Sequence, residues 1–399
     1  MSSYLAGAPA YRGAWAAVAY TFAGSGVMFG CWASRIPDVK ADLDLSAGAL
    51  GLALLGAAVG SLLSLPLGGA AAVRFGSPRT TRVAYLAMSV LAMLPGLAPD
   101  GVVLFVALLL WGAAMGACDV AMNIQAVSVE RHFGRASMSG FHAMMSLGAL
   151  LGAGLGSLGA AWSLPVAVNL GLVAAVLLIG FGVLARGFVP DPVAGGESPP
   201  LFARPSGRLI AVGAVAFIVL ITEGAMADWS AVYLREDLDA PAGLAGLGFA
   251  AFSAAMTLGR LAGDRVVTWW GTRRLLQTLT ALAAFGLGAG LVSGSSIGAV
   301  AGFAVLGLGL SATFPVLVSD AGSGRHPGAA IAAVTTCGYV GFLVGPPALG
   351  ALAELVGLRS ALGVLPVLLV VACGLTFLAA GRQVTPRAPA GPGEPGRAR

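Results

Sequence analysis

KADLDLSAGALG, at residues 40–51, returns as REDLDAPAGLAG at residues 235–246, 195 positions later. Six of the twelve positions are identical, and a basic residue opens each copy. The same offset, without a gap, aligns further pairs in the following loop: Gly68 with Gly263, Gly76 with Gly271, and Arg79 with Arg274. The repeat predicts two halves of parallel topology. Paired halves of this kind commonly enclose a binding site near the middle of a membrane and rock around it.

The composition places both halves in a membrane. Apolar residues make up 58% of the 399 positions and charged residues 10%, whereas a soluble domain has roughly 25% charged residues. Long apolar runs argue against disorder and against an outer-membrane barrel. The net charge of +5 does not indicate nucleic-acid binding, because the excess bases lie in loops on one side. The four cysteines lack metal-ligand spacing, and we expect them to pack in the core, with no metal or cofactor.

Twelve apolar segments are long enough to cross the bilayer, which takes about 20 residues in a helix. The expected fold is therefore all-α and integral to the membrane. The segments are 13–33, 47–70, 82–99, 101–125, 138–160, 164–185, 209–233, 243–262, 275–292, 297–318, 328–350 and 360–380.

Basic residues give the orientation of this arrangement. An even number of spans puts both termini on one side, and 18 of the 22 Lys and Arg residues fall there. Bases stay on the cytoplasmic side of short loops, so we expect cytoplasmic termini in the cell (inner) membrane. The predicted parts are an N-terminal six-helix half, a cytoplasmic linker, a C-terminal six-helix half and a disordered tail, at 1–187, 188–207, 208–380 and 381–399.

Asp119 and Asn123 are candidate binding residues in the fourth span. An Asp at the bilayer centre costs roughly 2.5–3.5 kcal/mol on insertion scales, so it needs a reason to be there. Asn123 follows four residues later, lies on the same helix face, and supplies both donors and acceptors. Such a pair suits a hydroxylated solute or a proton. The alternative is a buried structural pair that orients helices.

Glu223 and Asp228 are further acids, in the seventh span. Their five-residue spacing corresponds to about 140° around a helix, so they do not share one narrow face. Glu223 is the deeper and is the expected proton-exchanging group. Asp228 lies nearer the outside, where its expected role is to pair with a base.

Arg35 and His142 complete the candidate binding set. Arg35, three residues before Asp38, pairs either with that carboxylate or with Asp228 across the cavity as an outer gate, because the repeat places Arg35 opposite Ser230. His142 begins the fifth span at about the depth of Asp119. It forms either an Asp–His proton relay or a local hydrogen bond.

The loop after the second span, Gly69 to Arg79, resembles the G-x-x-x-D-R-x-G-R-R motif of the major facilitator superfamily, with Val73 at the position of the acid. A second copy begins at Gly259 and keeps the acid and the bases. In that family the motif holds the halves outward-open through charge pairs. The resemblance therefore implies gating roles for Arg74, Gly76, Arg79, Asp264, Arg265 and Arg274.

Within that superfamily, Gly-x-Cys-Asp-x-x-x-Asn at 116–123 and Gly-Phe-His at 140–142 resemble the fucose-permease branch and its uncharacterised bacterial inner-membrane relatives. The resemblance implies that Asp119 couples sugar recognition to proton movement. The branch also has an acid in the first span, and residues 22–34 contain none. Glu223 is the candidate for the proton exchange that an acid in the first span would otherwise carry out.

These observations predict a secondary active transporter of a small polar, sugar-like solute, with alternating access and proton coupling. Proton-driven efflux of apolar or drug-like compounds and a non-transporting membrane sensor are the alternatives. The sequence contains no nucleotide-binding loop and no HExxH motif, and we do not expect an enzyme. The expected partners are the solute, protons and lipid, for a protein that functions as a monomer.

Overall fold

The computed structural model describes residues 2–134, 137–190, 207–322 and 327–379, and every regular element in these residues is a helix. Twelve of the described helical segments are long and apolar enough to cross a membrane, as predicted. Most of the predicted linker and the predicted tail, residues 191–206 and 381–399, lie outside the described residues.

The first six spans form one bundle, called here the N half. Its elements are α1 (Ser2–Asp42), α2 (Ala47–Phe75), α3 (Ser77–Leu91), the 3-10 helix η1 (Leu94–Leu97), α4 (Gly101–Phe133), α5 (Met138–Ala161), α6 (Val166–Leu184) and the 3-10 helix η2 (Ala185–Gly187).

The last six spans form the C half. Its elements are α7 (Gly207–Glu236), α8 (Ala242–Ala245), α9 (Leu247–Trp270), α10 (Thr272–Val292), α11 (Ser296–Leu310), α12 (Thr313–Gly322), α13 (Pro327–Val356), α14 (Leu358–Leu362) and α15 (Val364–Ala379).

Helices extend beyond the apolar segments that predicted them. The first span runs over Ala10–Asp42 and the second over Ala47–Phe75, because polar helix ends project past the apolar layer. The tenth span is two helices, α11 and α12, separated at Ser311 and Ala312. Hydropathy does not detect such a break, because both parts are apolar.

The repeated sequence marks equivalent turns in the two halves. Asp44 and Asp239 follow the first and seventh spans with φ of 49° and 50°, and Gly76 and Gly271 separate consecutive helices with φ of 83° and 76°. Asp tolerates the left-handed region better than most residues, and glycine lacks the Cβ that opposes it. The identities at the 195-residue offset therefore preserve backbone turns.

Small residues allow close helix contacts inside and between the halves. A Cβ on Gly26 of α1 or on Gly152 of α5 would overlap the backbone of the facing helix. Gly51 of α2 and Gly350 of α13 make a similarly close contact between the halves. Close approach through glycine is typical of helix packing in membranes.

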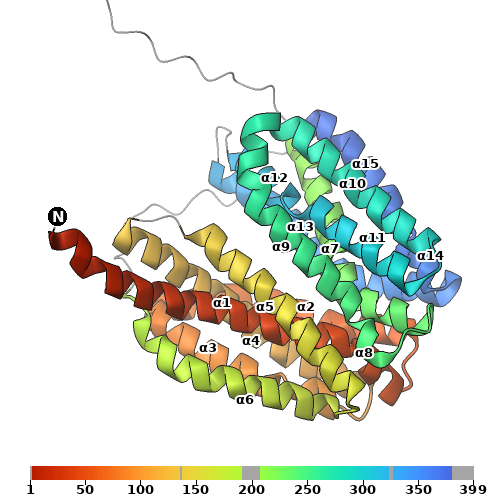
Figure 1. The fold of residues 1–399 in the computed structure, drawn as a ribbon, viewed down its shortest axis with the longest axis horizontal. Coiled ribbons are helices and arrows are strands. Elements are labelled where there is room, and N and C mark those ends of the chain that lie inside the picture. Colours follow the sequence, from red (N-terminus) through yellow and green to blue (C-terminus); the bar gives the residue numbers. More distant parts are fainter. Residues whose placement is uncertain (1, 135–136, 191–206, 323–326, 380–399) are drawn as a thin grey trace, which may run out of the picture.

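Two polar contacts join the halves at one face. We call this the far face; α1 ends and α2 begins there, and the opposite face, where α1 begins, is the terminal face. Lys40 Nζ lies 2.7 and 2.9 Å from the carboxylate oxygens of Glu236. Glu354 Oε2 accepts from the Gly48 amide at 2.7 Å. Figure 1 shows the two groups of helices meeting beside α8 and diverging toward the N-terminus of α1.

The ends of the connection between the halves are held by residues at equivalent repeat positions. Gln125 of α4 donates to the Val189 carbonyl and accepts from the Val189 amide, at 2.8 and 3.1 Å. Asp320, 195 positions later, accepts from Arg208 at 2.6 Å. Each half thus fixes its own end of the connecting segment.

Candidate functional site

A cavity of ≈ 950 Å³ leads from the terminal face toward the middle of the N half. Gly76 and Arg131, at the ends of α2 and α4, line its mouth, and Asp119 lines its inner part. Most of its surface is apolar. The lining residues are Leu65, Ala72, Val73, Gly76, Asp119, Val120, Asn123, Ile124, Val127, Ser128, Arg131, Met138, His142 and Tyr339.

Asp119 and Asn123 make the contact that their spacing predicts. The Asn123 amide donates to the Asp119 carbonyl oxygen at 2.8 Å and to carboxylate Oδ1 at 3.2 Å. No base among the described residues pairs with this carboxylate. A half-buried acid therefore lines the cavity with one hydrogen bond to its side chain, which leaves acceptor capacity for a ligand.

His142 lines the same cavity but makes no hydrogen bond with Asp119, so the predicted relay contact is not formed in this structure. Its ring packs edge-on against Phe22, with centroids 5.2 Å apart, and its carbonyl oxygen accepts from Ser146 at 3.2 Å. Tyr339 of α13 brings the C half to the cavity wall.

Glu223 pairs with Arg260, which directly follows Gly259 at the start of the second motif copy. Arg260 Nη2 lies 3.6 Å from Glu223 Oε1, and Nη1 donates to Ser146 Oγ of the N half at 2.9 Å. Nε donates to the carbonyl oxygen of Ser311 at 3.4 Å, at the break in the tenth span. Arg260 therefore joins an acid of α7 to a helix of the opposite half.

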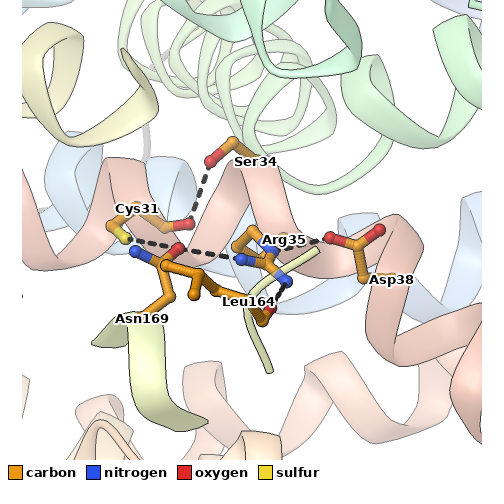
Figure 2. Close-up of polar contacts among 6 residues, drawn as sticks. All are labelled: Cys31, Ser34, Arg35, Asp38, Leu164 and Asn169. Carbon is orange, nitrogen blue, oxygen red and sulfur yellow. Dashed lines mark hydrogen bonds and ion pairs between the residues drawn. The ribbon is translucent and has the colours of Figure 1, made fainter. Parts of the chain in front are cut away.

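Arg35 takes the first of its two predicted arrangements, and the predicted gate with Asp228 is not formed here. Its Nε donates to Asp38 Oδ2 at 2.6 Å, Nη1 to Asn169 Oδ1 at 2.9 Å and Nη2 to the Leu164 carbonyl at 2.6 Å (Figure 2). All three nitrogens are occupied by the nearer residues of the N half.

Asp228 lacks the basic partner that the sequence analysis expected. It is half-buried, and no hydrogen bond or ion pair joins it to another described residue. The only base predicted to face it is already held within the N half, as Figure 2 shows.

The candidate gating residues lie at the terminal face. Arg74, Arg79 and Arg274 are exposed, and the Arg74 guanidinium lies 5.2 Å from the centroid of the Phe75 ring. Gly76 forms the turn between α2 and α3. The side chains of Asp264 and Arg265 lie outside the described residues. Among the described side chains, Arg74, Arg79 and Arg274 form no ion pair.

The described residues contain no group of three or more His, Cys, Asp and Glu side chains that could hold a metal ion. Cys31 and Cys118 are buried, in line with a packing role, whereas Cys337 is exposed.

Comparison with known proteins assigns this chain to a family. An uncharacterised MFS-type transporter of Yersinia pestis is 38% identical over 92% of this chain and 94% of its own length. The chain belongs to the major facilitator superfamily. The family profile described as Major Facilitator Superfamily matches residues 209–398. The membrane protein MosC of Rhizobium meliloti is 34% identical, over 93% of this chain and 91% of its own length.

Solved structures of superfamily transporters share the fold at much lower identity. The nucleoside transporter NupG superposes with a TM-score of 0.73, at 11% identity over 92% of this chain and 98% of that chain. A bacterial homologue of the lysosomal transporter Spinster, in an inward-facing conformation, gives 0.69 at 16% identity, over 93% and 97%. The chain is thus a multi-pass membrane transporter of the major facilitator superfamily with the predicted twelve-helix fold.

Proposed function

We propose that this superfamily member is a proton-coupled transporter of a small polar solute with several hydroxyl groups. The observation that carries the proposal is the Asp119–Asn123 pair on the wall of the ≈ 950 Å³ cavity. Ligand sites combine largely apolar walls with a few polar groups that fix orientation. Here the carboxylate accepts from solute hydroxyls, the amide offers a second contact, and Tyr339 covers an apolar face of the solute.

Glu223 is the proposed proton site. Its ion pair with Arg260, at 3.6 Å, is longer than a charge-assisted hydrogen bond, and both side chains are only partly buried. Protonation of Glu223 removes its charge and weakens its hold on Arg260. Because Arg260 also donates to Ser146 of the N half, this step changes a contact between the halves, which is what coupling of proton movement to alternating access requires.

The proposed state of this structure is inward-facing. Polar contacts join the halves at the far face, whereas the cavity reaches the terminal face at Arg131 and Gly76. The distribution of bases puts the terminal face in the cytoplasm. We accordingly propose an inner (plasma) membrane protein with cytoplasmic termini that works as a monomer.

Proton flux in proteoliposomes tests the proposal. With a pH dye inside, sugars and other small polar metabolites are added outside, and valinomycin with potassium balances charge. A transported solute should acidify the lumen, and Asp119→Asn or Glu223→Gln should abolish the response. Asp239→Asn is the matched control, because this exposed acid lies in a far-face loop whose positive φ Asn also tolerates.

The mainly apolar surface of the cavity favours a second candidate, proton-driven efflux of apolar compounds. Under efflux, an inward solute gradient drives protons out and makes the lumen alkaline. If both acid variants transport as the parent does, the assignments of Asp119 and Glu223 are wrong. Specific solute binding without any flux would instead support the sensor.

A further inference from the structure

We propose that the C half carries a binding site for one anionic phospholipid, in the groove between α10 and α15. These two helices lie side by side at the edge of the C half (Figure 1). The groove has a volume of ≈ 470 Å³ and an almost entirely apolar lining. Its lining residues are Ala281, Ala284, Phe285, Pro366, Val367, Val370 and Cys373.

The end of this groove at the terminal face is basic. The Arg273 guanidinium lies 4.5 Å from the centroid of the Phe377 ring, which directs it toward α15. Arg274 follows it and is exposed, and no carboxylate of the described chain pairs with either arginine. None of the described side chains caps the start of α10 at Gly271, and amides at such a helix start favour an anion. These groups are complementary to a lipid phosphate.

Gln277 lies one helical turn below Arg273, about 6 Å along α10. Its Nε2 is buried and has no hydrogen-bond partner. Its backbone oxygen accepts from Cys373 Sγ at 3.5 Å, and Cys373 lines the groove. A buried amide without a partner is costly. An ester carbonyl of a lipid whose phosphate is held at Arg273 lies at this depth, and it supplies an acceptor once the Gln277 side chain turns toward the groove.

The apolar groove continues along the same faces. Ala281 and Phe285 follow Gln277 at successive four-residue steps, about 12 and 18 Å from Arg273. On α15, Val370 and Pro366 follow Cys373 toward the far face. Phe285 and Val370 are 68% and 63% exposed, so no other helix among the described residues covers them. From the terminal face inward, the lipid phosphate thus lies at Arg273, its ester at the Gln277 amide and its acyl chain in the apolar groove.

The N half fills the equivalent place with its own chain. Arg82 stands at the position of Gln277, 195 residues earlier, and donates to the Ala185 carbonyl at 2.8 Å. It also lies 5.6 Å from the centroid of the Phe188 ring, beside the end of α6. In the N half, the segment after α6 therefore occupies the place that corresponds to the end of the groove. Within the part of the chain that the structure describes, the lipid site is a feature of the C half alone.

Lipid titration of the purified full chain tests the proposal. Phosphatidylglycerol or phosphatidylcholine with the same acyl chains is added in detergent. Native mass spectrometry then counts the bound lipids, and Tm measures stabilisation, which grows with ligand concentration over Kd. One phosphatidylglycerol should bind where phosphatidylcholine does not. Arg273→Gln should weaken it about tenfold, by loss of a charge-assisted contact, and Ala281→Phe should block the groove.

Gln277→Leu separates a lipid contact from a structural role. It should raise Tm without lipid, because an unpaired buried amide is removed, and it should reduce the further rise with phosphatidylglycerol. Arg186→Gln, an exposed base of the N half at the terminal face, should bind lipid as the parent does.

Four results would overturn the proposal. They are equal binding of the two lipids, retention of phosphatidylglycerol by both Arg273→Gln and Ala281→Phe, and stabilisation by glycerol phosphate as strong as by the lipid. The fourth is a dimer that Ala281→Phe dissociates without any lipid bound, which would make the groove an interface between two copies.

Discussion

In the N half, buried charged and amide side chains have partners in the same half, whereas several in the C half do not. Arg35 donates to three residues and Gln125 bonds to Ser77 and Val189. In the C half, Asp228 and the Gln277 amide lack described partners, and Glu223 has one loose ion pair. The buried Arg35 and Gln125 of the N half thus have their partners within that half, and the C half retains charged and amide groups that remain available for other contacts.

The repeat is broken where the candidate site is built. Each site residue of one half aligns, at the 195-residue offset, with an apolar or small residue of the other half. The pairs are Asp119 with Phe314, Asn123 with Val318, His142 with Cys337, Met28 with Glu223, and Leu65 with Arg260. Positions that the halves share form turns, and positions at which they differ carry the polar chemistry. Exchanging residues between equivalent positions therefore tests what each difference does.

Arg35→Ser, which gives the N half the residue found at Ser230, should have the largest effect. Arg35 is 3% exposed, and its loss leaves Asp38, Asn169 and the Leu164 carbonyl without their donor. Removing one partner of a buried charged pair costs about 3–5 kcal/mol. We expect a large fall in Tm in detergent. Arg235→Ser, at an exposed position, is the control, and an equal Tm for Arg35→Ser and parent would contradict a structural role.

Arg260→Leu, which copies Leu65, should have a smaller effect on stability, about 1–3 kcal/mol, because the pair with Glu223 is only partly buried. The double change Glu223→Met and Arg260→Leu introduces the residues that the N half has at the equivalent positions, and it leaves neither charge unpaired. We expect it to recover the Tm of the parent but not solute-driven proton flux. Recovery of flux would show that the pair has no part in coupling.

Lys40→Gln removes the ion pair between the halves at the far face. Exposed pairs contribute about 0.5 kcal/mol, so the equilibrium should shift about twofold away from the state open at the terminal face. Labelling of Val120→Cys in the cavity, in a Cys337→Ser background, by a water-soluble maleimide measures that state. The difference in labelling rate between variant and parent should disappear at high salt, because salt also screens the ion pair in the parent. Unchanged labelling at low salt would show that this pair does not hold the far face.

Asp237 should give the smallest effect, a dependence of stability on pH. It lies outside the membrane spans, and burial raises the pKa of its carboxyl above the ordinary value, although the Arg359 amide opposes this with a hydrogen bond of 3.1 Å. The folded state then holds the proton more tightly than the unfolded chain, so stability should fall as pH rises through the raised pKa. Asp237→Asn should flatten Tm against pH in that range. The same slope in the variant would assign the effect to another group.

Periodicity and the repeat predicted the twelve spans, because long apolar runs and turn residues are local signals. They also predicted that Asp119 and Asn123 share a helix face. They did not predict the contact of Arg260 with Glu223 and Ser146. Arg260 lies beside the loop motif in the sequence, and only the packed helices bring it close to these residues. The choice of Arg35 between Asp38 and Asp228 depends on the turn at Leu164, and that proximity exists only after α5 and α6 pack.

The anchors at Gln125 and Asp320 have a consequence for how the polypeptide is organised. Val189 is hydrogen-bonded to the first half and Arg208 to the second, so each bundle holds its own end of the connection between them. A cut in the chain between these points would separate no helix from its anchor. Two gene fragments divided there would each encode a bundle with its anchor intact, and the close contacts at the far face would remain to reunite them.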